Sequence, residues 1–242
     1  MNRRKFILST GAASALAATP NLTQATTPAR DRKPGITIAS YMQRWRKHGT
    51  PESGNPPWND ALDVLDHCQE LGAGCLQIGV AKWTEDFAGK VRDRRESLGI
   101  HLEGQVRLPW KDNDIERFEK NLHAAKEAGA TVVRSICLGG RRYEDFQTLE
   151  QWNAFKADSK AALERAEPIL AKHKVKLGFE NHKDWRAEEH VQLLKHLGSE
   201  FIGATFDFGN NFALLEDPYE VAEALAPYLI TTHMKDMSLG RR

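Results

Sequence analysis

Short apolar runs alternate with longer amphipathic stretches from Ile36 to the end of the chain. The runs are rich in β-branched residues, which is typical of parallel strands that are covered on both faces. They predict seven strands, over residues 36–41, 75–80, 101–106, 131–138, 175–180, 202–207 and 229–233. Strict alternation of strand and helix, in units of roughly 25–45 residues, favours parallel βαβ units.

Helical periodicity fills the segments between the strands. It predicts helices over residues 58–71, 114–128 and 148–172, the first two ending at Gly72 and Gly129. Proline is poorly tolerated inside a helix, so Pro168 predicts a kink or break near the end of the third. Asp184 is expected to cap a helix that ends at Gly198. Asp217, followed by proline and a glutamate three residues after the cap, marks a further helix start.

A barrel is favoured over a doubly wound sheet because no glycine-rich phosphate loop follows the first strand, where the chain reads Met-Gln-Arg-Trp. A closed (β/α)8 TIM barrel has eight strands and about 250 residues. This α/β chain offers seven strands in residues 35–242. We therefore predict a TIM barrel that lacks the eighth βα unit, and expect the sequence to be part of a protein some 40–60 residues longer, as the barrel count requires.

The first 34 residues read as a targeting segment and not as part of the fold. Arg3-Arg4 precedes a weakly apolar stretch, Ala15-Leu16-Ala17 offers a cleavage site, and a polar spacer follows. This arrangement resembles a bacterial twin-arginine signal peptide and predicts export to the periplasm. The formal net charge of +1 gives no basic field for nucleic acid, so a small molecule is the expected partner. No membrane attachment of the mature protein is expected, and an oligomer is left open.

Three cysteines, Cys68, Cys75 and Cys137, have no metal-binding spacing. They are expected to be small buried hydrophobic residues, with a disulfide between the first two as the alternative. Arg134 falls in the middle of a predicted strand and needs a partner if it is buried.

Two carboxylates and an imidazole close three successive predicted strands. Glu180, Asp207 and His233 are separated by 27 and 26 residues, about one βα unit each. The carboxyl ends of barrel strands meet at one mouth, where active sites lie. This set of donors suits Mg²⁺, Mn²⁺, Co²⁺ or Zn²⁺, so we predict a divalent-metal site.

The runs Gly178-Phe179-Glu180-Asn181-His182, Phe206-Asp207-Phe208-Gly209-Asn210 and Thr232-His233-Met234-Lys235-Asp236 resemble the xylose isomerase-like TIM-barrel superfamily. That family contains sugar isomerases and epimerases. The resemblance implies a metal held by Glu180, Asp207, His233 and a glutamate on the eighth strand, which has no counterpart here. Many relatives have histidine where this chain has Asn210, which argues against a second metal.

The resemblance implies an isomerase or epimerase that removes a proton beside the carbonyl of a sugar or sugar derivative and passes through an enediolate. Glu180 would be one acid/base group. His182, Lys235, Glu103 and Asn210 are the predicted substrate-binding residues. The alternatives are a lyase or dehydratase, a hydrolase like endonuclease IV, and a carbohydrate-binding barrel without turnover.

Overall fold

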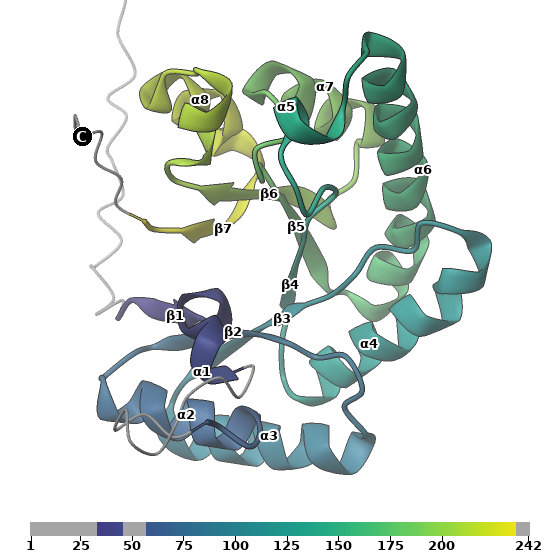
Figure 1. The fold of residues 1–242 in the computed structure, drawn as a ribbon. Coiled ribbons are helices and arrows are strands. Elements are labelled where there is room, and N and C mark those ends of the chain that lie inside the picture. Colours follow the sequence, from purple (N-terminus) through teal and green to yellow (C-terminus); the bar gives the residue numbers. More distant parts are fainter. Residues whose placement is uncertain (1–32, 46–56, 236–242) are drawn as a thin grey trace, which may run out of the picture. The chain divides into compact units, whose positions relative to one another are not determined.

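Seven parallel strands form one sheet, in which each strand pairs with its neighbours in the sequence. The computed structural model describes residues 33–45 and 57–235, so the predicted leader lies outside it except for Lys33 and Pro34. The strands are β1 (Gly35–Thr37), β2 (Cys75–Gly79), β3 (His101–Gln105), β4 (Val132–Ser135), β5 (Lys176–Glu180), β6 (Ile202–Asp207) and β7 (Leu229–His233). The sheet curls as in a TIM barrel (Figure 1). The predicted α/β fold, with seven strands and no eighth unit in the described part of the chain, is confirmed.

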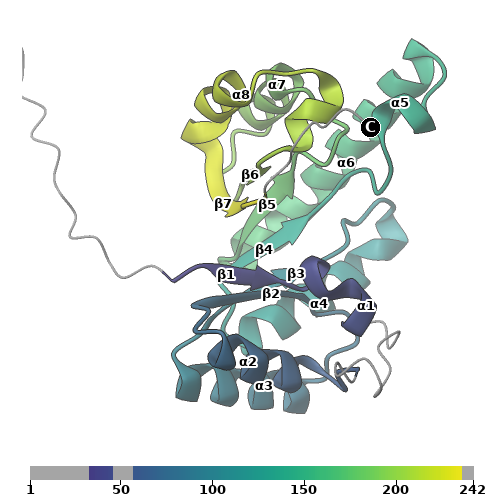
Figure 2. The ribbon, with the colours of Figure 1, turned by 60° about the vertical axis from the view of Figure 1, so that its left-hand side comes forward.

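Helices line the outside of the curled sheet (Figures 1 and 2), and consecutive helices pack against one another, as α2 does on α3 and α3 on α4. The helices are α1 (Met42–Trp45), α2 (Ala61–Glu70), α3 (Glu85–Leu98), α4 (Ile115–Glu127), α5 (Arg142–Asp145), α6 (Leu149–His173), α7 (Ala187–Leu197) and α8 (Pro218–Leu225). No helix of the described segments is long and apolar enough to cross a membrane.

The two faces of the sheet differ in polarity. Side chains alternate between the faces of a strand, and the residues that point outward are apolar and buried under the helices, as Leu76, Val133 and Phe179 are. The inner face is polar, because Gln77, Glu103 and the residues bonded to them face into the curl. The barrel interior therefore holds a hydrogen-bonded network where a purely apolar filling would otherwise be expected.

Helix ends follow the predicted signals. The Asp217 side chain accepts hydrogen bonds from the backbone N–H groups of Tyr219 (2.8 Å) and Glu220 (3.2 Å), and so begins α8. Gly129 and Gly198 have φ angles of 84° and 56°, a conformation that glycine adopts without strain after a helix end. These features fix where the chain leaves each helix for the next strand.

Three local predictions need correction, and one helix was missed. Residues 36–41 are not one strand: β1 ends at Thr37 and residues 38–41 form a 3₁₀ helix, because Tyr41 turns to pack its ring 5.3 Å from that of Trp58. Asp184 does not cap α7, since it accepts instead from the backbone N–H groups of Leu138 and Trp185. Helix α6 is not broken at Pro168, since it continues to His173. Helix α3 was not predicted, because most of its residues are charged and few are buried.

All three cysteines are free, so the predicted alternative of a Cys68–Cys75 disulfide is wrong. Cys68 and Cys137 are buried, as expected of small hydrophobic residues, and Cys75 is half-buried. Burial raises the pKa of Cys68 to about 11 and that of Cys75 to about 12. Because thiolates are the reactive form, these side chains are unsuited to nucleophilic chemistry.

Candidate metal centre

Glu180, Asp207 and His233 lie at the carboxyl ends of β5, β6 and β7, as predicted. Asp207 and His233 are direct partners in the β6–β7 register. Glu180 pairs with Thr205 of β6, two residues before Asp207. One ligand atom from each residue lies within 4.8 Å of the other two. The parallel register thus brings together three side chains that are far apart in the sequence.

Two cations neutralise the carboxylates of this group. Arg134, from β4, places Nε 2.6 Å and Nη2 2.5 Å from Oε2 of Glu180. Nζ of Lys235 lies 3.0 Å from Oδ1 of Asp207 and donates to Oδ1 of Asn210 at 2.8 Å. Arg134 thereby has the partner that its position in a strand required.

The charges shift the pKa values of the ligand residues in opposite directions. Burial alone would raise the pKa of Glu180, but the hydrogen bond from His233 and the charge of Arg134 outweigh it and lower the pKa to about 2. Burial alone would lower the pKa of His233, but its hydrogen bonds to Asp207 and Glu180 raise it to about 9. A metal ion that binds His233 must therefore displace a proton.

The donor set fits a divalent cation. Two carboxylates and one imidazole are ligands of Mn²⁺, Co²⁺ and Zn²⁺, and three protein ligands leave coordination positions for substrate or water. Oδ1 of Asp207 is buried and has no hydrogen-bond partner, although Lys235 is close enough for an ion pair. This oxygen, paired with a charge but not hydrogen-bonded, is free to serve as a metal ligand.

The predicted substrate-binding residues occupy different surroundings. His182 is half-buried and its Nδ1 donates to the Leu138 carbonyl at 3.0 Å; burial lowers its pKa. Asn210 is buried and donates to Oε1 of Glu180 at 3.3 Å while accepting from Lys235. Glu103 lies inside the curl on β3, away from the strand ends.

Sequence reasoning missed two buried amides that support the ligands. Asn181 accepts from the backbone N–H of Asp207 at 2.8 Å and so fixes the end of β6. Gln77 lies 2.8 Å from Nε2 of His233. The signal for Gln77 was a polar residue in the middle of an apolar run, Cys-Leu-Gln-Ile-Gly. That pattern marks an inward-facing polar position but does not identify its partner.

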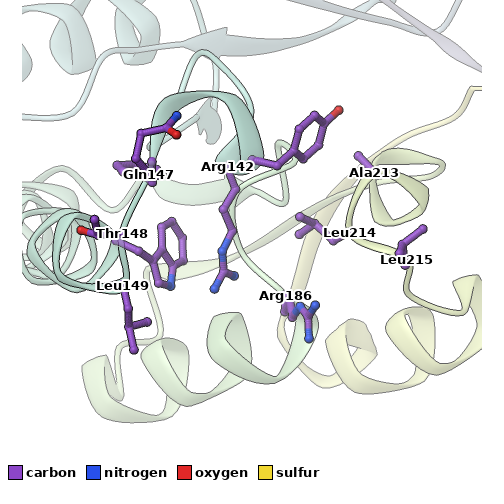
Figure 3. A pocket seen from close by; sticks show the side chains of 11 residues that line it. Arg142, Gln147, Thr148, Leu149, Arg186, Ala213, Leu214 and Leu215 are labelled. Carbon is purple, nitrogen blue, oxygen red and sulfur yellow. The ribbon is translucent and has the colours of Figure 1, made fainter.

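Two hollows lie near these elements. A cleft of about 340 Å³ between β1 and β7 is lined by Thr37, Gln77, Glu103, Thr231 and His233, so it reaches the ligand set. A second hollow, of about 440 Å³, lies among α5, the start of α6 and residues 213–215 (Figure 3). None of the three ligand residues lines the second hollow.

The chain matches known proteins along most of its length. A family model described as xylose isomerase-like TIM barrel matches residues 106–242. The 3-oxo-isoapionate decarboxylase of Pectobacterium atrosepticum is 24% identical over 211 residues, which are 86% of this chain and 70% of that protein.

Solved structures of sugar epimerases and of a dehydratase have the same fold. D-psicose 3-epimerase from Clostridium cellulolyticum H10 has a TM-score of 0.67 at 14% identity, over 83% of this chain and 72% of that one. The probable 3-DHS dehydratase AsbF of Bacillus anthracis has a TM-score of 0.64 at 15% identity, over 86% and 74%. At these identities the two structures establish the fold alone.

Proposed function

Because the chain belongs to the xylose isomerase-like TIM barrel family, we propose that it is a divalent-metal-dependent enzyme that isomerises or epimerises a sugar or sugar derivative. One observation carries the proposal: ligand atoms of Glu180, Asp207 and His233 lie within 4.8 Å of one another at three adjacent strand ends. Epimerases among the structures of this fold support the substrate class. The predicted leader supports a periplasmic location, which fractionation of cells that produce the full chain would test.

Removal of a proton beside a carbonyl group is the step that this site suits. A divalent cation, when bound, polarises the carbonyl and stabilises the negative charge that develops next to it. Glu180 is the acid/base residue of the proposal, since Arg134 and Asn210 hold its carboxylate in one orientation. Lys235 and Nε2 of His182 provide a donor and an acceptor for substrate hydroxyl groups. Asn210 takes part by positioning Lys235, whose Nζ it binds at 2.8 Å.

A decarboxylase that acts on a related sugar acid is the second candidate. The 24%-identical relative is a 3-oxo-isoapionate decarboxylase. Loss of CO₂ from a 3-oxo acid leaves its electron pair beside the carbonyl, so the same charge is stabilised without a base, and one proton donor completes the reaction. Lys235, at the edge of the site, is placed to pair with a substrate carboxylate.

The two activities are separated by one set of incubations in D₂O. Ketoses and 3-oxo sugar acids are incubated with the protein and Mn²⁺, Co²⁺, Mg²⁺ or Zn²⁺, and the exchange of the α proton is followed by NMR while CO₂ is trapped. Metal-dependent exchange with ketoses supports the isomerase, and CO₂ release supports the decarboxylase. If the protein binds the metal but shows neither proton exchange nor CO₂ release, both proposed activities are refuted. The remaining interpretation is then a carbohydrate-binding barrel without turnover.

A pair of aspartate variants controls this experiment. Asp207→Asn keeps the shape of the side chain and removes a charged ligand, so metal-dependent exchange should be lost. Asp217→Asn makes the same chemical change at the start of α8, outside the ligand set, and should retain exchange. Equal activity of the two variants would refute the assignment of the site.

A further inference from the structure

Gln77 lies in the middle of β2, on the inner face of the sheet, and its side chain is hydrogen-bonded at both ends. The residue is 4% exposed. Its Oε1 lies 2.8 Å from Nε2 of His233 and accepts from Nε2 of Gln105 at 3.0 Å. Its Nε2 donates to Oε2 of Glu103 at 2.9 Å. A single amide thus joins a carboxylate on β3 to a ligand histidine on β7.

Glu103 decides which way this amide faces. An ionised carboxylate only accepts hydrogen bonds, so the NH₂ group of Gln77 must point to it and the carbonyl oxygen must point away. Glu103 is itself held by the Thr231 hydroxyl, which lies 2.9 Å and 3.0 Å from its two oxygens. The orientation of Gln77 therefore follows from its partners.

The same logic extends to the imidazole. A carbonyl oxygen only accepts, so Nε2 of His233 must carry a hydrogen and donate it to Gln77. Nδ1 is then the nitrogen left for a metal, and it is the one that lies 3.2 Å from Oε2 of Glu180 and 3.8 Å from Oδ2 of Asp207. The ring is thus oriented with its coordinating atom toward the other two ligands.

We infer that Gln77 is a positioning residue for the metal centre: held by Glu103, it keeps the proton of His233 on Nε2 and presents Nδ1 as the ligand atom. This inference rests on the proposed metal site. Hydrogen-bond partners of ligand histidines fix the ring and its tautomer, and their loss typically weakens metal binding by about 10–100-fold.

The first test measures Co²⁺ affinity from the visible absorption of the bound ion. Gln77→Met keeps the length of the side chain and removes its hydrogen bonds, so Co²⁺ should bind about 10–100-fold more weakly. Gln105→Met is the matched control, because it removes the other hydrogen bond to Oε1 of Gln77 but leaves the bond with His233 intact, and its affinity should change much less. Unchanged affinity in Gln77→Met would overturn the inference.

A double variant separates positioning from simple structural damage. Glu103 acts on the site through Gln77, so Glu103→Met should also weaken Co²⁺ binding, and adding it to Gln77→Met should cause no further loss. If the two residues acted independently, the factors by which the single variants weaken Co²⁺ binding would multiply in the double variant. Multiplied losses in the double variant would therefore contradict the chain of contacts that we propose.

The nitrogen that binds the metal is observed directly in the wild-type protein, and a variant is needed only to assign the signals of the ring. Long-range ¹H–¹⁵N spectra of the histidine rings are recorded for the Zn²⁺-loaded protein and assigned with His233→Gln. A metal on Nδ1 and a hydrogen on Nε2 support the inference, and a metal on Nε2 overturns it. Wild-type protein that binds neither Co²⁺ nor Zn²⁺ would refute the proposed metal site itself, which distinguishes the two failures.

Discussion

Replacement of Arg134 by methionine removes the guanidinium group that pairs with Glu180 and leaves His233 to offset the charge of the buried carboxylate. Glu180 is 1% exposed and the Arg134 side chain 15%, so solvent offers little screening. Breaking such a buried pair by removing one partner costs about 3–5 kcal/mol. For a chain of this size each kcal/mol lowers the melting temperature by about 2–4 °C, which gives a decrease of roughly 6–20 °C.

The assay is thermal unfolding followed by circular dichroism, first in EDTA and then in Mn²⁺. In Arg134→Met, a bound Mn²⁺ ion supplies positive charge beside Glu180. It also no longer competes with the guanidinium group of Arg134 for the carboxylate. Binding at 100 times the dissociation constant stabilises a protein by about 2.7 kcal/mol. The variant should bind Mn²⁺ more tightly than the wild type, so the difference in melting temperature should shrink when the metal is added.

Arg142→Met is the control for this experiment. Arg142 makes two hydrogen bonds to Glu189, at 2.6 Å and 3.3 Å, in a pair outside the ligand set. Its loss should lower the melting temperature by the same amount in EDTA and in Mn²⁺. If the deficit of Arg134→Met were equally insensitive to Mn²⁺, the assignment of Glu180 as a ligand would be refuted.

Three further predictions concern the scaffold. Burial lowers the pKa of His190 to about 3. As the pH falls, His190 takes up a proton in the unfolded chain before it does so in the folded protein. The free energy of unfolding should therefore decrease at pH values under about 6.5, by about 2 kcal/mol at pH 5. Urea unfolding at pH 7 and pH 5 should show a smaller loss in His190→Leu; equal losses would contradict the assignment. Asp217→Ala should destabilise by about 1 kcal/mol, measured in the same way, because α8 loses its cap. A Cβ on Gly203 would meet the Tyr228 carbonyl oxygen at 2.3 Å, so Gly203→Ala should destabilise by about 1–3 kcal/mol, whereas Gly79→Ala, with open space, should not.

The grouping of Glu180, Asp207 and His233 was predictable, because parallel strands place their carboxyl ends on one edge of a sheet and these three residues end successive strands. The partner of Arg134 was not predictable, since a barrel makes β4 and β5 neighbours but does not say which side chains of the two strands meet; Arg134 is in register with Gly178 and yet pairs with Glu180. Asp184 was wrongly predicted to be a helix cap, because its carboxylate accepts a hydrogen bond from the backbone N–H group of Leu138, in a loop far away in the sequence. Sequence patterns specify elements and their order, whereas side-chain pairing across the curl depends on register and curvature.

Hydrogen bonds across the inner face connect the two halves of the sheet: one half carries the candidate ligands and the other carries residues that orient one of them. All three ligand residues come from β5, β6 and β7, within residues 106–242 that match the family model. The contacts that orient His233 come from β2 and β3, in the segment before residue 106. A chimaera that grafts the later strands onto a foreign first half would inherit the ligands without the geometry that makes them a site. The proposed metal centre therefore depends on strands that contribute no ligand to it.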